Sequence, residues 1–406
     1  MSGELSIHGA KNSALPLLAA AILCQGKTVI HNCPDLSDVD AAFRILRHLG
    51  CGVRRENDMV VIDAESIETS EIPATLMREM RSSIVFLGAI AARTGRAKLS
   101  FPGGCELGPR PIDLHLAALK KLGLTIEEDH GFLDCRSDVP LRGADVIFPI
   151  SSVGATENVM LAASLAKGTT TIHNAAREPE ICDLAAFLNA CGADIRGAGE
   201  SIVEIRGVKT LTGCEYTVMP DRIAAATYMA AAAVTGGELD LLNVVPEHVK
   251  PIVPVFEEAG CRLRFWGNNL TIQAPARLSS MHHVVTGVFP GFPTDAQPTT
   301  MAMAAVARGN SMFVETIFEN RFKQVGELAR LGAKIKVDGR VAVVEGVEKL
   351  SGAPVMATDL RGGASLVIAA LAAEGTTSID EIHHIDRGYE RMEETLCAVG
   401  ADIQRV

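Results

Sequence analysis

The stretch ILRHLGCGV, residues 45–53, recurs in altered form along the whole chain. Each copy has a helix-like run, a glycine and then a short β-like run. The other copies are ALKKLGLTI (118–126), FLNACGADI (187–195), VFEEAGCRL (255–263), ELARLGAKI (327–335) and TLCAVGADI (395–403). Their glycines, beginning with Gly50, follow one another at intervals of 73, 69, 68, 72 and 68 residues. The sequence therefore consists of six units of one design.

A second series of glycines lies upstream of the first in each unit. These glycines end alanine-rich segments and stand at positions 26, 95, 168, 236, 309 and 375. Glycine is common just past a helix end, because it tolerates the left-handed conformation found there. Each unit thus reads helix, glycine, strand, loop, helix, glycine, strand, and this β/α repetition predicts an α/β fold.

The first helix of each unit carries alanine where a surface helix would carry charge. We therefore expect these helices to be buried, with the sheets around them. Six units exceed one core of ~150 residues, so the sequence predicts two lobes of three units each. We expect residues 12–217 in an N-terminal lobe, residues 1–11 and 218–406 in a C-terminal lobe, and the active site in the cleft between them.

Charge and composition restrict the possible functions. The net charge of −11 disfavours binding to nucleic acid or to an anionic membrane, which both require a basic surface. The apolar runs fall short of the ~18 residues of a membrane span, and the opening residues carry no secretory pattern, so we expect a cytoplasmic protein. The ten cysteines contain no C-x-x-C pair, and we expect neither a metal site nor a cofactor.

The loops of the repeats carry the candidate chemistry. The loop FPGGCELGPRPID, residues 101–113, places Cys105 and Arg110 among glycines and prolines, as in a lid that presents a thiol. Other loops carry Arg177, Arg321 and the pair Arg387 and Arg391. Because guanidinium groups bind phosphate and carboxylate in bidentate fashion, arginines in equivalent loops indicate an anion site.

Two further positions stand directly before apolar helices. Lys11 and Asn12 in GAKNSALP lie where free amide groups and the helix dipole bind anions. Asp295 in FPTDAQ fits a helix N-cap or, alternatively, a general base.

Together these residues resemble the UDP-N-acetylglucosamine 1-carboxyvinyltransferase family, the enolpyruvyl transferases that open peptidoglycan synthesis. The resemblance covers nearly the whole chain. Its motifs, in the family's order, are GAKNSALP, PGGCELGPRPIDLH, SVGAT, NAAREPEI, PDRI, FPTD, FENRF, VMATDLR and HIDRGYER. It implies the enolpyruvyl transferase fold, a two-lobed inside-out α/β barrel with three βα repeats per lobe.

The resemblance also implies a role for individual residues. Phosphoenolpyruvate would bind Lys11, Asn12, Arg110 and Arg387, and the catalytic residues would be Cys105, Asp295, Lys11 and Arg387. UDP-N-acetylglucosamine would bind Asn12, Arg81, Arg110, Pro111, Ile112, Asp113, Leu114, Ser152, Val153, Gly154, Asp295 and Ile317. Arg321, Asp359 and Arg361 would support the site. The implied partners are these two small substrates alone.

The implied reaction suits these residue types. Adding a hydroxyl across an enol double bond requires an acid near the methylene carbon, here Cys105, and a base near the attacking oxygen, here Asp295. Loss of phosphate then requires cationic side chains. The product would feed cell-wall biogenesis, and through it cell shape, the cell cycle and cell division.

The sequence departs from the family at one position of the nucleotide site. Many members have lysine two residues before the serine of SVGAT, where this chain has Ile150. Ile150 leaves open an enolpyruvyl transferase for another uridine nucleotide. A catalytically silent paralogue that binds UDP-sugar is the other alternative.

The implied role of Cys105 predicts that a substitution can prevent alkylation of this residue and still leave the enzyme active. Cys105→Asp should keep turnover but resist fosfomycin, the epoxide antibiotic that attacks this cysteine in the family. Cys105→Ala should lose most activity, because a positioned acid contributes ~10²–10⁴-fold. Phosphate release at saturating substrates measures both effects, with Cys182→Ser as the control. A Cys105→Ala enzyme as fast as the wild type would exclude the acid role.

Overall fold

The computed structural model describes residues 1–101 and 112–406. They form two compact units. The N-terminal unit contains residues 9–101 and 112–219, and the C-terminal unit contains residues 1–8 and 220–406. Each unit is built from three of the six repeats.

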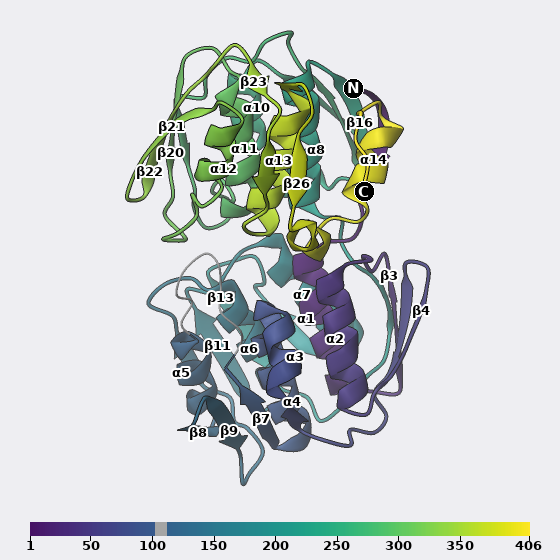
Figure 1. The fold of residues 1–406 in the computed structure, drawn as a ribbon. Helices are drawn as coiled ribbons and strands as arrows, with labels where there is room; N and C mark the ends of the chain where they lie inside the picture. The colour runs from purple at the N-terminus through teal and green to yellow at the C-terminus, as the bar shows by residue number, and fades with distance from the viewer. Residues whose placement is uncertain (102–111) are drawn as a thin grey trace. The chain divides into compact units, whose positions relative to one another are not determined.

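One helix of each repeat lies in the interior of its unit, as the alanine-rich segments predict (Figure 1). In the N-terminal unit these inner helices are α1 (Lys11–Ala20), α4 (Phe86–Thr94) and α6 (Val153–Ala163), and in the C-terminal unit α8 (Arg222–Thr235), α11 (Gln297–Ala305) and α13 (Leu360–Leu371). Every residue of α6 from Ala155 to Ala163 is buried, and so is every residue of α8 from Arg222 to Ala233. The three inner helices of the C-terminal unit pack pairwise on one another, and α4 packs on both α1 and α6.

The second helix of each repeat ends just before a glycine of the first series. These helices are α2 (Ser37–His48), α5 (Asp113–Lys121), α7 (Pro179–Ala190), α10 (Val253–Glu258), α12 (Val325–Arg330) and α14 (Met392–Ala398). Shorter elements are α3 (Ala74–Glu79), α9 (Pro246–Val249), η1 (Ala21–Leu23), η2 (Arg81–Val85), η3 (Thr294–Ala296) and η4 (Ile382–Arg387). The charges on α2 complement its helix dipole: acidic residues stand in the first turn, where Asp38 is buried, and Arg47 and His48 stand in the last turn.

The described residues of the N-terminal unit form three four-stranded sheets of one topology. In each sheet the first pair of strands is parallel and the others are antiparallel. The orders are β15 (Glu215–Thr217), β3 (Lys27–His31), β5 (Met59–Asp63), β4 (Gly52–Glu56); β6 (Glu71–Ile72), β7 (Arg96–Ser100), β9 (Phe132–Arg136), β8 (Thr125–Asp129); and β10 (Asp145–Ile147), β11 (Thr169–His173), β13 (Ile202–Arg206), β12 (Asp194–Arg196). The short strands β2 (Cys24–Gln25) and β14 (Leu211–Thr212) pair separately.

The C-terminal unit repeats this topology in two of its sheets. They are β1 (Ser2–Ser6), β16 (Glu238–Leu242), β18 (Asn269–Gln273), β17 (Arg262–Trp266), and β19 (His283–Val285), β20 (Asn310–Val314), β22 (Val341–Glu345), β21 (Lys334–Asp338). The last repeat has only the parallel pairs β24 (Pro354–Met356) with β26 (Ser378–Asp380) and β23 (Leu350–Ser351) with β25 (Ala373–Glu374). The strand predicted after Gly400 is wrong: residues 401–406 are irregular, and no described strand pairs with them.

The two glycine series have the backbone conformation that the sequence predicts. All twelve glycines have positive φ, between 61° and 103°. A side chain at these positions would strain the backbone, so the sharp exit from each helix into the next strand depends on glycine.

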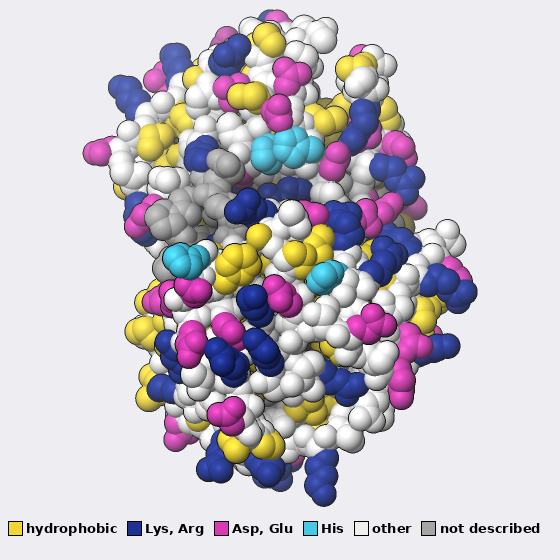
Figure 2. All heavy atoms as spheres, turned by 60° about the horizontal axis from the view of Figure 1, so that its bottom comes forward, with side chains coloured by type: hydrophobic (Ala, Val, Ile, Leu, Met, Phe, Trp, Pro, Cys, Tyr) yellow, Lys and Arg dark blue, Asp and Glu magenta, His cyan; other side chains and the backbone are white. Residues whose placement is uncertain are grey.

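No helix of the described chain is long and apolar enough to cross a membrane. Figure 2 shows Lys and Arg side chains interspersed with Asp and Glu on the face that it presents. This distribution agrees with the net charge, which disfavours a polyanionic partner.

Because the inner helices approach one another closely, the addition of a single methyl group between them should change the free energy of unfolding. A Cβ at Gly88 of α4 would lie 2.4 Å from the backbone oxygen of Asn158 in α6. Gly88→Ala should therefore lower the free energy of unfolding by about 1–3 kcal/mol, as overpacking does. Gly326→Ala in α12 is the matched control, because a Cβ there has no neighbour within 4 Å; it should be neutral or raise stability by up to about 1 kcal/mol. Urea titration measures both, and equal effects would contradict the packing argument.

Candidate active site

The beginnings of the inner helices carry about half of the predicted site residues. Lys11 and Asn12 open α1, Arg81 opens η2 just before α4, Ser152 caps α6, Asp295 lies in η3 before α11, and Asp359 caps α13. An apolar helix buried on all sides exposes polar backbone groups only at its ends, and its first turn presents N–H groups that bind anions. The repeat thus supplies a place for polar chemistry in every unit of the chain.

Lys11 is buried and pairs with an acid that the sequence did not single out. Its Nζ lies 2.7 Å from Oδ2 of Asp38, which stands in the first turn of α2. A buried ammonium requires such a partner. Asn12, the next residue, is half-buried.

A buried carboxylate fixes the first turn of α1. Asp183 of α7 accepts hydrogen bonds from the Ser13 hydroxyl, from the Tyr216 hydroxyl at 2.7 Å and from the Met219 amide at 3.4 Å. The Ala10 amide in turn donates to the Met219 carbonyl at 2.7 Å. Burial raises the pKa of Asp183, against the lowering effect of these hydrogen bonds. The turn that carries Lys11 is therefore held from two sides.

Several of the predicted nucleotide residues lie near His115 of α5. Ile112 is buried, and Asp113 and Leu114 open α5 directly before His115. Ser152, Val153 and Gly154 begin α6, and a Cβ at Gly154 would lie 3.0 Å from the His115 ring. The start of α6 can therefore approach this ring only because residue 154 is glycine.

His115 is a polar residue of this cluster that sequence reasoning missed. Its Nδ1 accepts a hydrogen bond from the Asn158 amide group at 2.8 Å, which leaves the proton on Nε2. Asn158 also donates to the Ile84 carbonyl and accepts from the Gly88 amide, at 3.0 Å and 2.7 Å. Burial lowers the pKa of His115 to about 4, with the positive charge of Arg81 acting in the same direction. The ring is thus neutral, and Arg81 belongs to the same group of residues.

In the C-terminal unit, Asp295 is held by two buried arginines. Its carboxylate accepts hydrogen bonds from Nη2 of Arg321 at 3.2 Å and from Nε of Arg361 at 3.4 Å. Arg321 also donates to the Thr294 carbonyl and pairs with Asp359 at 3.7 Å. Two adjacent cations favour the ionised carboxylate, which is the form that can accept a proton.

Arg361 connects Asp295 with the segment that carries Arg387. Its guanidinium lies 5.3 Å from the centre of the Tyr389 ring, and the Tyr389 hydroxyl is 2.9 Å from that of Thr227. Neither terminal nitrogen of Arg361 has a hydrogen bond of good geometry to a described residue, although the side chain is almost fully buried. Buried guanidinium nitrogens normally have acceptors, so these donors are suited to an anionic ligand. Arg387 ends η4 and is half-buried.

Ile317, predicted for the UDP-sugar site, is held next to Asp295 by another missed residue. Glu315 accepts from the amides of Ile317 at 2.8 Å and Phe318 at 3.0 Å through Oε1. Its Oε2 accepts from the Thr294 hydroxyl at 3.0 Å. Glu315 is almost fully buried, and nothing in its local sequence distinguishes it from a solvated glutamate.

For several of the residues singled out in the sequence, the structure gives no support for a place in the site. Cys105, Arg110 and Pro111 lie outside the described residues. Arg177 is exposed, and Ile150, at the position of the family's lysine, is exposed as well. Within the described part of the chain, no group of three or more His, Cys, Asp and Glu side chains could hold a metal ion.

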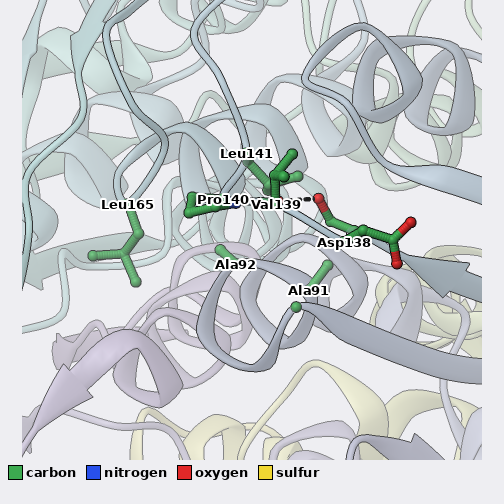
Figure 3. Close-up of a pocket in the computed structure, with 9 residues that line it drawn as sticks. Ala91, Ala92, Asp138, Val139, Pro140, Leu141 and Leu165 are labelled. Carbon is green, nitrogen blue, oxygen red and sulfur yellow. Dashed lines mark hydrogen bonds between the residues drawn. The ribbon is translucent and has the colours of Figure 1, made fainter.

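A cavity of about 330 Å³ in the N-terminal unit is separate from these residues. Figure 3 shows it between Ala91, Ala92, Leu165 and the segment from Asp138 to Leu141. A hydrogen bond from the Ser137 hydroxyl to the Val139 carbonyl folds that segment. Its lining is mainly apolar and includes none of the predicted site residues, so it is not the predicted site.

Comparison with known proteins supports one family along the whole chain. The sequence model of the EPSP synthase (3-phosphoshikimate 1-carboxyvinyltransferase) family matches residues 1–396. UDP-N-acetylglucosamine 1-carboxyvinyltransferase 2 of Caldanaerobacter subterraneus subsp. tengcongensis is 53% identical over 404 residues, covering 100% of this chain and 97% of its own. UDP-N-acetylglucosamine 1-carboxyvinyltransferase 1 of Symbiobacterium thermophilum is 50% identical, with coverage of 100% and 93%.

Solved structures support the fold. The enolpyruvyl transferase NikO from Streptomyces tendae matches with a TM-score of 0.87 at 26% identity, covering 100% of this chain and 96% of that one. EPSP synthase from Acinetobacter baumannii matches with a TM-score of 0.76 at 18% identity, covering 100% and 97%. The predicted enolpyruvyl transferase fold is confirmed.

The environment of His115 predicts a titration far from the ordinary value. Its imidazole should remain neutral down to a pH of about 4, instead of gaining a proton near 6.5. Between these values the unfolded chain binds a proton that the folded chain does not, so this residue lowers stability as the pH falls from 6.5 towards 4. NMR titration of histidine ring signals checks the pKa, and the signal missing from His115→Asn identifies the residue. A midpoint near 6.5 would show that the ring is not buried beside Arg81.

Proposed function

We infer that the chain, which belongs to the UDP-N-acetylglucosamine 1-carboxyvinyltransferase family, transfers the enolpyruvyl group of phosphoenolpyruvate to UDP-N-acetylglucosamine. The acceptor is the 3-hydroxyl of the sugar, and phosphate is released. The family and the enzyme class rest on full-length similarity, and the assignment of residues is our proposal.

The observation that carries the residue assignment is the setting of Asp295. A carboxylate between two buried arginines, of which one has terminal nitrogens without acceptors of good geometry, suits a base beside an anionic substrate. A hydroxyl is a weak nucleophile, and a base within hydrogen-bond reach activates it.

In the addition step, the sugar oxygen forms a bond to C2 of phosphoenolpyruvate. Asp295 accepts the hydroxyl proton, and Cys105 donates a proton to the methylene carbon, which becomes a methyl group. In the elimination step, the Cys105 thiolate takes a proton back from that methyl group, and the electrons of the C–H bond form the new double bond. The bond between C2 and the phosphate oxygen breaks with its electron pair on the oxygen, and the proton held by Asp295 passes to the departing phosphate. The enol ether and inorganic phosphate are the products.

Cationic groups of the proposed site bind the anionic substrates and the departing phosphate. We assign Lys11, Arg387 and Arg110 to phosphoenolpyruvate, with Asn12 beside Lys11. Fixed positive groups stabilise the charge that develops as phosphate leaves. The ion pair of Lys11 with Asp38 holds the ammonium group in one place before the substrate binds.

The nucleotide sugar is assigned to the cluster around His115 and to the segment near Ile317. Arg81, the start of α5 and the residues Ser152–Gly154 supply this part of the site, together with Arg110 and Pro111. The exposed Ile150 supplies no charge for the diphosphate, so the arginines and the amides at the start of α6 must bind it. These groups belong to both units.

The wider role follows from this reaction. We propose that the chain works in the cytoplasm, that it catalyses the first committed step of peptidoglycan synthesis, and that it thereby serves cell shape, growth and division. We expect it to be a target of fosfomycin. An enzyme for another uridine nucleotide is not favoured, because two full-length relatives named for UDP-N-acetylglucosamine are 50% and 53% identical to this chain.

A direct assay distinguishes the proposed reaction from its alternatives. Phosphate release should require phosphoenolpyruvate together with UDP-N-acetylglucosamine, and UMP should not replace the nucleotide sugar. Release with UMP alone as acceptor would favour another uridine nucleotide. Binding of the UDP-sugar without any release would indicate the silent paralogue.

The same assay tests Asp295. Asp295→Asn should lower kcat by about 10²–10⁴-fold, because the amide cannot accept the hydroxyl proton. Asp338→Asn, an exposed residue at the end of β21, is the matched control and should keep the wild-type rate. A loss of less than about tenfold at Asp295 would assign the base to another residue.

A further inference from the structure

The segment that carries Arg387 has an acidic residue on each side. Asp386 lies in η4 immediately before Arg387, and Glu393 lies in the first turn of α14. The residues between them form a short connection that includes Tyr389. An interaction that holds Asp386 and Glu393 together therefore closes this connection at its base.

Arg405 makes that interaction. Its Nη1 and Nη2 donate to the two carboxylate oxygens of Asp386 at 3.1 Å and 2.6 Å. Its Nε and Nη2 donate to the two oxygens of Glu393 at 2.7 Å and 3.2 Å. One guanidinium group thus makes a bidentate contact with each of two carboxylates, the strongest geometry for such pairs. These hydrogen bonds raise the pKa of Arg405, so it stays charged.

The backbone of this connection has a strained conformation that other contacts must stabilise. Arg391 has a φ of 37°, in the left-handed region that disfavours residues other than glycine. Strain of this kind persists only where the surrounding contacts determine the backbone. One such contact is the buried Tyr389, which packs on Arg361 and bonds to Thr227. A further one is the Arg405 network, which is partly solvated.

The side chains of the Arg405 network are partly exposed to solvent, unlike those of a buried ion pair that stabilises the whole fold. The side chain of Arg405 is 42% exposed and that of Asp386 is 32% exposed. Ion pairs that solvent can reach usually contribute little to stability. Arg405 therefore affects where the connection lies far more than whether the unit folds.

We propose that Arg405 is a positioning residue for Arg387. It fixes Asp386 and Glu393, and through them it orients the Arg387 guanidinium for the phosphoenolpyruvate anion. This inference rests on the proposed function, in which Arg387 binds that substrate. Preorganised groups bind an anion more tightly than mobile ones, because less ordering is required on binding.

The test compares Arg405→Ala and Arg405→Lys with a matched control. Arg136 is also an exposed arginine that bridges two carboxylates, Glu127 and Asp134, but it lies in the hairpin of β8 and β9, which carries no proposed site residue. Steady-state kinetics give kcat and KM for each substrate. Hydrogen exchange of residues 386–393 reports on the connection without any need for activity.

Arg405→Ala should raise KM for phosphoenolpyruvate about tenfold, below the ~10²-fold loss that a 1 Å misplacement can cause. KM for UDP-N-acetylglucosamine should change by less than about twofold, since Arg387 is assigned to the other substrate. The KM of Arg405→Lys for phosphoenolpyruvate should lie between those of Arg405→Ala and the wild type. An ammonium group keeps the charge but cannot form the two bidentate contacts. Exchange in residues 386–393 should be faster in Arg405→Ala, and Arg136→Ala should match the wild type in every measurement.

Equal KM values for phosphoenolpyruvate in Arg405→Ala and Arg136→Ala, in an active enzyme, would overturn the inference. Unchanged exchange of residues 386–393 would also overturn it. A wild-type enzyme without turnover would instead refute the proposed function and the ligand of Arg387, while the exchange measurement would still decide whether Arg405 orders this connection.

Discussion

The burial of six alanine-rich helices is the constraint on which the rest of each unit depends. These helices are apolar almost all round, so each unit must surround them with sheets and with the second helix of every repeat. Small side chains permit close contact, and at Gly88 the contact leaves no room for a methyl group. The packing of the core therefore depends on small side chains at the helix contacts as much as on the large side chains that fill the remaining space.

The same burial explains where polar chemistry can occur. A helix enclosed on all sides meets solvent or ligand only at its ends, and its first turn has amide groups that need acceptors. Asp359 accepts from two of these amides in α13, and Asp221 does so in α8. Lys11, Ser152 and Asp295 stand at equivalent places in other repeats. The repeat thus places polar and charged side chains at the start of several inner helices.

Charged residues at these positions are held by partners that differ in burial. Arg321 and Arg361 are almost fully buried with Asp295, so loss of one member would leave an uncompensated charge in a medium of low polarity. Arg405 holds its segment from the solvated side, where each ion pair adds little to stability. The buried contacts fix Asp295, and the solvated contacts of Arg405 join Asp386 to Glu393.

The sequence by itself determined the repeat, the inner helices, the helix-terminal glycines and the family, because these depend on local periodicity and on contiguous motifs. It also singled out Lys11, Asp295 and the arginines as candidate site residues, because they stand in such motifs. It did not predict Asp38, Asp183, His115, Glu315 or the role of Arg405, and it wrongly predicted a strand after Gly400. Those features depend on contacts between residues far apart in the chain, such as Ser13 with Asp183, or on whether a neighbouring strand exists to pair with. Tertiary packing decides both, because a polar side chain acquires its role only from the partner that folding brings to it.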